Sequence, residues 1–160
     1  MTDDGRRLLE ARWRLQEFAD LDLHEVADGL LSAGEDADAL IRLFSLDRDQ
    51  LLWEGGVVFE DLFREWGGGM MSESEAVETV LLDMSRALLE ERLTPEEATD
   101  RAGAIYVRTG WQYDELVEWF CLDEEFDDLK RAGLSDAGRD RASIESAVRS
   151  LARSIVKRHS

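Results

Sequence analysis

The stretch "GEDADALIRLFSLD" (residues 34–47) recurs in related form as "GWQYDELVEWFCLD" (residues 110–123). Six of the fourteen aligned positions are identical, namely Gly, Asp, Leu, Phe, Leu and Asp. The glycine can end one helix in a left-handed conformation, the aspartates can start helices, and the apolar positions can pack inward. The two stretches therefore predict the same helix–turn–helix arrangement twice in one chain.

We interpret this similarity as an internal duplication. Two helical units would cover about residues 1–68 and 72–135, related by a pseudo-twofold axis, and a basic C-terminal helix would cover about residues 139–158. Short helices can also resemble one another through a shared amphipathic pattern, but that pattern does not explain the common glycine and the two common aspartates. The units would pack together as a single all-α domain over residues 1–160.

Composition favours helices throughout the chain. One proline and twelve glycines are too few for the closely spaced turns of a β-sandwich or β-barrel. The clearest helix start is "LTPEEA" (residues 93–98), with Thr94 as N-cap and Pro95 at the first helical position. Asp47 predicts a second N-cap, with Gln50 at the capping-box position. We expect a compact all-α bundle of about seven to nine helices.

Two segments allow more detailed expectations. Leu52, Phe59 and Trp66 recur every seven residues, and this apolar stripe keeps its phase across Gly55-Gly56, which predicts one continuous helix. A helix over about residues 36–45 is expected to bury Leu40, Leu43 and Phe44. The sequence "GGGMM" (residues 67–71) predicts an interruption between the two units.

The charge of the chain is strongly negative and unevenly distributed. The formal net charge is −18, and residues 1–138 contain 13 basic and 35 acidic residues, a net charge of −22. The segment from Arg139 onward has six basic and two acidic residues. A body this acidic repels nucleic acid and anionic membranes and attracts basic proteins. The expected partner is therefore a basic protein, with no direct contact to nucleic acid or membrane.

Several features indicate a bacterial cytoplasmic protein. The N-terminal segment is charged, unlike a secretory signal, and no apolar run approaches the roughly 20 residues of a membrane span. A single cysteine, Cys121, excludes an intrachain disulfide, and it is expected to be a small buried core residue. Arginine supplies seventeen of the nineteen basic residues, which indicates a GC-rich bacterial gene.

The densest acidic stretch runs from Asp114 to Asp128 and contains eight carboxylates without a basic residue. The aromatic residues Tyr106, Trp111 and Phe120 lie close to it in sequence, and such residues are enriched at binding hot spots. Carboxylates beside aromatic residues make this segment the best candidate partner-binding surface. Its predicted residues are Tyr113, Asp114, Glu115, Glu118, Trp119, Asp123, Glu124, Glu125, Asp127 and Asp128.

The sequence contains no recognisable catalytic or cofactor-binding motif, so no catalytic residue and no cofactor are predicted. Two histidines, His24 and His159, and one cysteine are too few for a zinc site. We expect a non-enzymatic, acidic protein-binding module that shields or restrains a basic partner, as an immunity protein or a regulator does. Two alternatives stay open. One is a hydrolase that uses a divalent metal at Asp123–Asp128. The other is a structural protein that forms a homodimer, with the basic terminal helix on the acidic body of a second copy.

Overall fold

The computed structural model describes residues 1–19, 22–68, 71–132 and 138–159. The described residues form helices, turns and loops without any strand, which confirms the all-α prediction. The chain divides into two compact units, Met1–Ala76 and Val77–Ser160. Gly69 and Met70, in the predicted interruption, lie outside the described residues. Within the described ranges, no helix combines the length and apolarity that a bilayer span requires.

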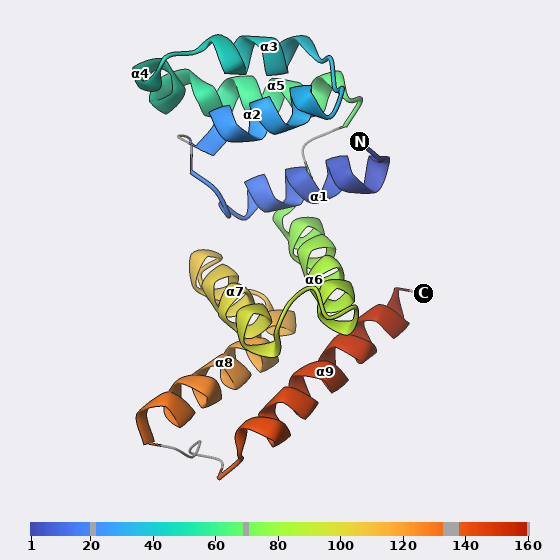
Figure 1. Ribbon diagram of the computed structural model, residues 1–160, viewed down its shortest axis with the longest axis vertical. Helices are drawn as coiled ribbons and strands as arrows, with labels where there is room; N and C mark the ends of the chain where they lie inside the picture. The colour runs from blue at the N-terminus through green and yellow to red at the C-terminus, as the bar shows by residue number, and fades with distance from the viewer. Residues whose placement is uncertain (20–21, 69–70, 133–137, 160) are drawn as a thin grey trace. The chain divides into compact units, whose positions relative to one another are not determined.

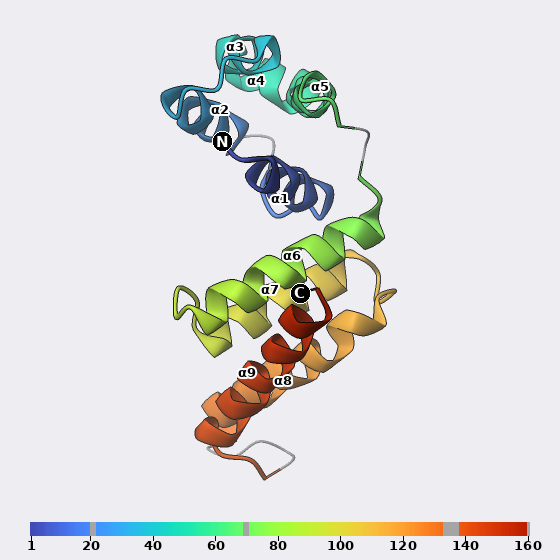
Figure 2. The ribbon, with the colours of Figure 1, turned by 90° about the vertical axis from the view of Figure 1, so that its right-hand side faces the viewer.

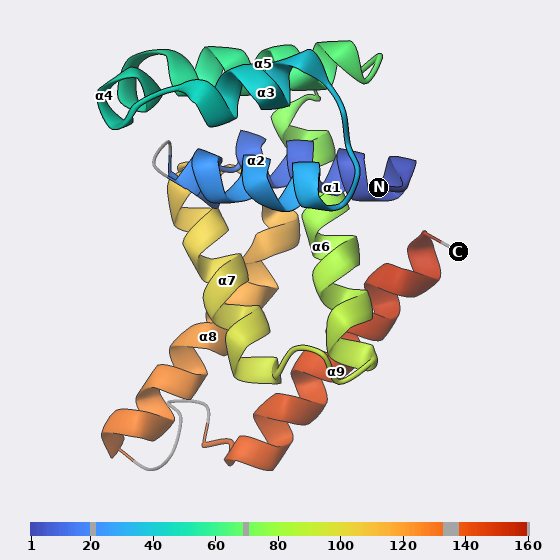
Figure 3. The ribbon, with the colours of Figure 1, turned by 45° about the horizontal axis from the view of Figure 1, so that its top comes forward.

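The first unit contains a layer of short helices. Its elements are α1 (Asp3–Arg14), α2 (Leu23–Ser32), α3 (Asp38–Ser45), α4 (Arg48–Gln50), a π-helical turn η2 (Leu51–Gly55) and α5 (Gly56–Glu65). Helices α2, α3 and α5 lie side by side in Figures 1 and 3. The predicted capping box at α4 is confirmed, because Asp47 accepts from the Gln50 backbone N–H and the Gln50 side chain accepts from the Asp47 backbone N–H, both at 2.9 Å.

Aromatic rings fill the core of this unit. Trp13 and Phe18 lie 5.1 and 5.8 Å from Phe59, and Phe59 lies 5.0 Å from Phe63, all in edge-to-face arrangements that are favourable for aromatic pairs. Phe44 is not part of the core, contrary to the prediction. Helix α3 is short and buries Ala39, Leu40 and Leu43, which leaves Phe44 on its flank and half exposed.

The π-helical turn explains a second departure from the prediction. Residues 48–65 do form one continuous helical run, as predicted. However, the wider turn of a π-helix shifts the side chains that follow it around the helix axis. Leu51 is buried in place of Leu52, which is half exposed. The turn forms around Gly55, which is buried against Leu23: a Cβ atom at position 55 would lie 3.2 Å from the Leu23 Cδ1 atom.

We expect Gly55→Val to destabilise the first unit by about 1–3 kcal/mol, because the added carbons would overpack the contact with Leu23 and Leu51. Gly29→Ala is the matched control. No atom lies within 4 Å of a Cβ at Gly29, so alanine should raise the free energy of unfolding by about 1 kcal/mol through helix propensity. Denaturant titration monitored by circular dichroism measures both effects. A Gly55→Val chain as stable as wild type would contradict the steric explanation.

The second unit contains longer helices. Helix α6 (Glu73–Leu89) begins at the end of the first unit and continues into the second, where it is followed by α7 (Pro95–Arg108), α8 (Asp114–Ala132) and α9 (Arg141–Arg158). Helices α7 and α8 form a hairpin, and α9 packs against both (Figure 2). The predicted start of α7 is confirmed: Thr94 caps the helix, Pro95 is its first residue, and Glu97 completes the capping box.

The two related sequence stretches share a helix end at the glycine and a helix start at the aspartate, Asp38 and Asp114, but differ at the next residue after the glycine, where Trp111 has positive φ and Glu35 does not. Gly34 and Gly110 both have positive φ, of 86° and 66°. The residue after each glycine donates a 3.0 Å hydrogen bond to the carbonyl five residues earlier, as in a Schellman motif. The stretches then differ, because α3 ends at Ser45 and Asp47 caps a new helix, whereas α8 continues through Asp123. Common origin of the two stretches stays a prediction.

Candidate partner-binding face

The α7–α8 hairpin brings two consecutive helices into close contact along their length. The Lys130 ammonium lies 3.0 Å from the Glu96 carboxylate, which joins the start of α7 to the end of α8. Gly103, buried in α7, lets α8 approach closely: a Cβ at this position would lie 3.0 Å from Asp123 Oδ2 and 3.6 Å from Phe120 Cδ2. The absence of a side chain at Gly103 therefore positions Phe120 and Asp123 against α7.

Three aromatic rings cluster at the closed end of the hairpin. The Trp111 ring lies 5.0 Å from Tyr106 and 5.1 Å from Phe120, and the Tyr106 and Phe120 rings are 5.5 Å apart. Trp111 has a φ of 64°, a left-handed conformation that is uncommon for a bulky residue, and its side chain is 54% exposed. Val117, one turn before Cys121 on α8, is also exposed. This end of the hairpin presents a partly open apolar surface.

Two exposed carboxylates lie on the same part of α8. In the described part of the chain, Asp114 and Glu124 form no ion pair and are exposed. Glu124 follows Phe120 by four residues and therefore lies on the same side of α8. We use the term hairpin face for the three rings and their neighbouring side chains. Its members are Tyr106, Trp111, Asp114, Val117, Phe120, Asp123 and Glu124.

Asp123 is the most perturbed carboxyl group of this face. Burial, and to a lesser extent the negative charges of Asp100, Asp127 and Glu124, together raise the pKa of Asp123 from the ordinary value of 3.8 to about 6. A hydrogen bond from the Thr99 hydroxyl offsets only part of these effects. Because no cation compensates Asp123 among the described residues, a positive charge brought to this point would be stabilised.

Four of the predicted binding residues have other roles. Trp119 is fully buried in the core and cannot contact a partner. Glu125 forms a bidentate ion pair with Arg139. Asp127 pairs with Lys130 and Arg131 within α8. Glu115 lines a cavity of about 240 Å³ with residues of α6 and α9. These contacts stabilise the second unit and do not contribute to the hairpin face.

The remaining predicted binding residues are not part of the hairpin face. Tyr113 and Asp128 are half-buried, and both interact with other residues of the fold. Glu118 is exposed, but it precedes Phe120 by two residues and therefore points to a different side of α8. Cys121 is exposed, in contrast to the core position expected for it. It lies on the outer stripe of α8, because the helix continues where the sequence predicted a buried turn.

The arrangement of the acidic stretch does not favour metal binding. Among the described residues, no three side chains of histidine, cysteine, aspartate or glutamate come close enough to hold an ion. The reason is the continuous helix: successive carboxylates point in different directions around α8. Asp123 faces α7, Glu124 faces solvent, and Glu125 reaches Arg139.

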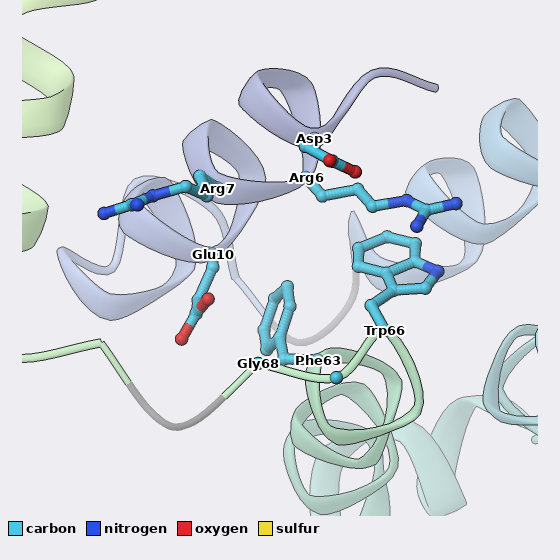
Figure 4. A pocket seen from close by; sticks show the side chains of 8 residues that line it. Asp3, Arg6, Arg7, Glu10, Phe63, Trp66 and Gly68 are labelled. Atoms are coloured by element: carbon cyan, nitrogen blue, oxygen red, sulfur yellow. The ribbon is translucent and has the colours of Figure 1, made fainter.

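A cavity of about 160 Å³ in the first unit has mixed polarity (Figure 4). Arg6 stacks over the Trp66 ring at 5.1 Å and donates a 2.9 Å hydrogen bond to Glu35. Glu10, which is buried, accepts a 2.6 Å hydrogen bond from the Met71 backbone N–H. These polar groups are engaged in holding α1 against the rest of the unit. The lining residues are Asp3, Arg6, Arg7, Glu10, Phe63, Trp66, Gly67 and Gly68.

Comparison with known proteins gives no assignment. No family model matches the chain, and no curated protein or solved structure is significantly similar to it. The function therefore has to be inferred from the geometry of the chain itself.

Proposed function

We propose that the protein is a non-enzymatic, acidic binding module that shields or restrains a basic partner protein through the hairpin face. The observation that supports this most directly is Asp123, a half-buried carboxyl group surrounded by other carboxylates and placed beside an open cluster of aromatic rings. A partner's arginine would relieve the repulsion at Asp123 and could stack on Trp111 or Tyr106. Both interactions would be gained only on binding.

The charge of the whole chain supports the same kind of partner. With a net charge of −18, the protein attracts basic proteins over long distances, and such steering accelerates association by roughly 10–10³-fold. Suitable partners are a nuclease that the protein inhibits or a nucleic-acid-binding regulator that it restrains. In either case the carboxylates would occupy a surface that otherwise binds phosphate groups.

A low-salt pull-down from the source cells, eluted with salt and analysed by mass spectrometry, tests this function. We expect basic proteins to be retained by the wild-type chain and released at high salt, because exposed charges are screened. Glu124→Lys should abolish retention of the specific partner, whereas Glu78→Lys, at an exposed position on α6, should leave most of it. Binding that is equally strong at low and high salt, or equally reduced by both substitutions, would argue against the hairpin face.

A further inference from the structure

The first unit has an exposed apolar surface of its own. Trp53 is 85% exposed, and four other large apolar side chains are each more than half exposed. Isolated exposed apolar residues are ordinary on protein surfaces, but a group of them on adjacent elements indicates an interaction site. We call this group the α3–η2 face. Its members are Ile41 on α3, Leu52 and Trp53 on η2, and Val57 on α5, whereas the Phe44 ring lies 6.0 Å from the His24 ring on α2.

The helices α3 and α5 run antiparallel next to each other. Both carboxylate oxygens of Glu65, at the end of α5, accept from the Ala39 backbone N–H at the start of α3, at 3.1 and 3.2 Å. Further along, Arg42 pairs with Asp61 at 3.3 Å. Val57 precedes Asp61 by one helical turn on α5, and Trp53 is exposed on the π-helical turn that leads into α5.

The π-helical turn places Trp53 in solvent. Packing of Leu23 against Gly55 fixes the turn, and the turn buries Leu51 while it directs Leu52 and Trp53 outward. Turns of this kind are frequent at functional sites. An exposed tryptophan contributes nothing to the core, whereas tryptophan is among the residues most enriched at binding hot spots.

The charges around the α3–η2 face define the chemistry of its occupant. Residues 36–61 contain seven carboxylates and two arginines, a net charge of −5. Asp38, Asp49 and Glu54 are exposed and form no ion pair within the described part of the chain. An apolar centre with an acidic rim disfavours an anionic membrane, and it disfavours a second copy of the same face because like charges would meet. It is complementary to an apolar anchor flanked by lysine or arginine.

We propose that the α3–η2 face is a second docking surface, which binds a cationic, amphipathic segment of a partner protein. Apolar side chains of that segment contact Trp53 and Val57, and its basic residues pair with Asp49 and Glu54. This surface belongs to the first unit, and the proposal does not rest on the function assigned to the hairpin face.

Two synthetic peptides of equal length and charge provide the probe. One combines leucine and lysine in an amphipathic helical pattern, and the other has serine at every leucine position. Titration into the ¹⁵N-labelled full chain is followed by the indole N–H signals of the five tryptophans, with Trp53 assigned from a Trp53→Phe variant. We expect the leucine peptide to shift the Trp53 signal saturably and to bind about tenfold more tightly than the serine peptide. Glu54→Lys, which keeps the Trp53 signal, should reduce the affinity at this face by about tenfold.

The other outcomes overturn the proposal. Equal shifts from both peptides would show charge attraction without an apolar site, and an unchanged Trp53 signal would show no site. A Trp53 signal that changes on dilution of the free protein would identify a second copy as the occupant. Broadening by anionic lipid vesicles, without a response to the leucine peptide, would identify a membrane. The Trp111 signal reports separately on the hairpin face, so failure at one surface is distinguishable from failure at the other.

Discussion

Replacing Trp119 by alanine is expected to lower the free energy of unfolding of the second unit by about 3–5 kcal/mol, because the indole is fully buried and alanine leaves a large cavity. Trp119→Phe should cost considerably less. The Trp119 N–H is buried without a hydrogen-bond partner, so phenylalanine removes an unsatisfied donor together with part of the ring. Hydrogen exchange at the backbone amides of α8 measures these effects in the second unit directly.

Trp111 provides the matched comparison for Trp119. Its side chain is more than half exposed, so Trp111→Ala should change stability by no more than about 1 kcal/mol while it weakens partner binding by about tenfold or more. The two tryptophans thus separate folding from recognition within one hairpin. If Trp111→Ala destabilised the unit as strongly as Trp119→Ala, the ring cluster would be part of the core and not a binding surface.

Asp123→Asn is expected to stabilise the second unit at neutral pH. A pKa raised from 3.8 to about 6 means that the folded protein holds the carboxylate less well than the unfolded chain does. The full shift corresponds to at most about 3 kcal/mol, and partial contact with solvent reduces the expected gain to about 1–2 kcal/mol. Asparagine removes the charge while it preserves the shape of the side chain.

The stability gained by Asp123→Asn should depend on pH. Below about pH 4 the carboxyl group is protonated in both folded and unfolded chains, so Asp123→Asn should have little effect. As the pH rises from about 4 through 6, wild-type stability falls relative to the variant, and the difference reaches its plateau above that range. Denaturant titrations across this range test the prediction. A difference that does not vary with pH would contradict the assigned cause.

Asp47 is the control at the corresponding position of the first stretch. There the aspartate caps α4, and asparagine is an equally good N-cap, so Asp47→Asn should be nearly neutral at every pH. Asp123→Asn should also weaken binding of a basic partner, because it removes a charge of the hairpin face. A variant that gains stability and loses affinity identifies a residue retained for function.

The helix starts were predictable because they depend on local chemistry. Thr94, Pro95 and Asp47 act through side-chain contacts within a few residues, and the structure has each of them in the predicted role. The all-α fold followed from helical periodicity and from the scarcity of turn residues. These signals do not require knowledge of the tertiary structure.

The departures from prediction arise where tertiary contacts decide the outcome. The seven-residue spacing of Leu52, Phe59 and Trp66 predicted that Leu52 packs inward. Its actual position depends on the packing of Leu23 against Gly55, two residues that are distant in sequence. Asp123 was expected to cap a new helix, but α8 continues through it.

The hairpin face was predicted only in part. Its carboxylates stood out in the sequence, but the choice between Trp111 and Trp119 depends on which side of α8 packs inward. Val117 was overlooked as a surface residue, although its counterpart in the first stretch, Ile41, is exposed as well. Comparison of the two stretches with a helical wheel could have identified both residues.

The exposed position of Cys121 has a practical consequence for studying this protein. The chain has a single thiol, and it lies between Val117 and Glu124 on the outer stripe of α8. A maleimide dye or nitroxide attached there would occupy the border of the hairpin face without any engineered substitution. The native molecule thus carries its own labelling handle for spectroscopy of complex formation.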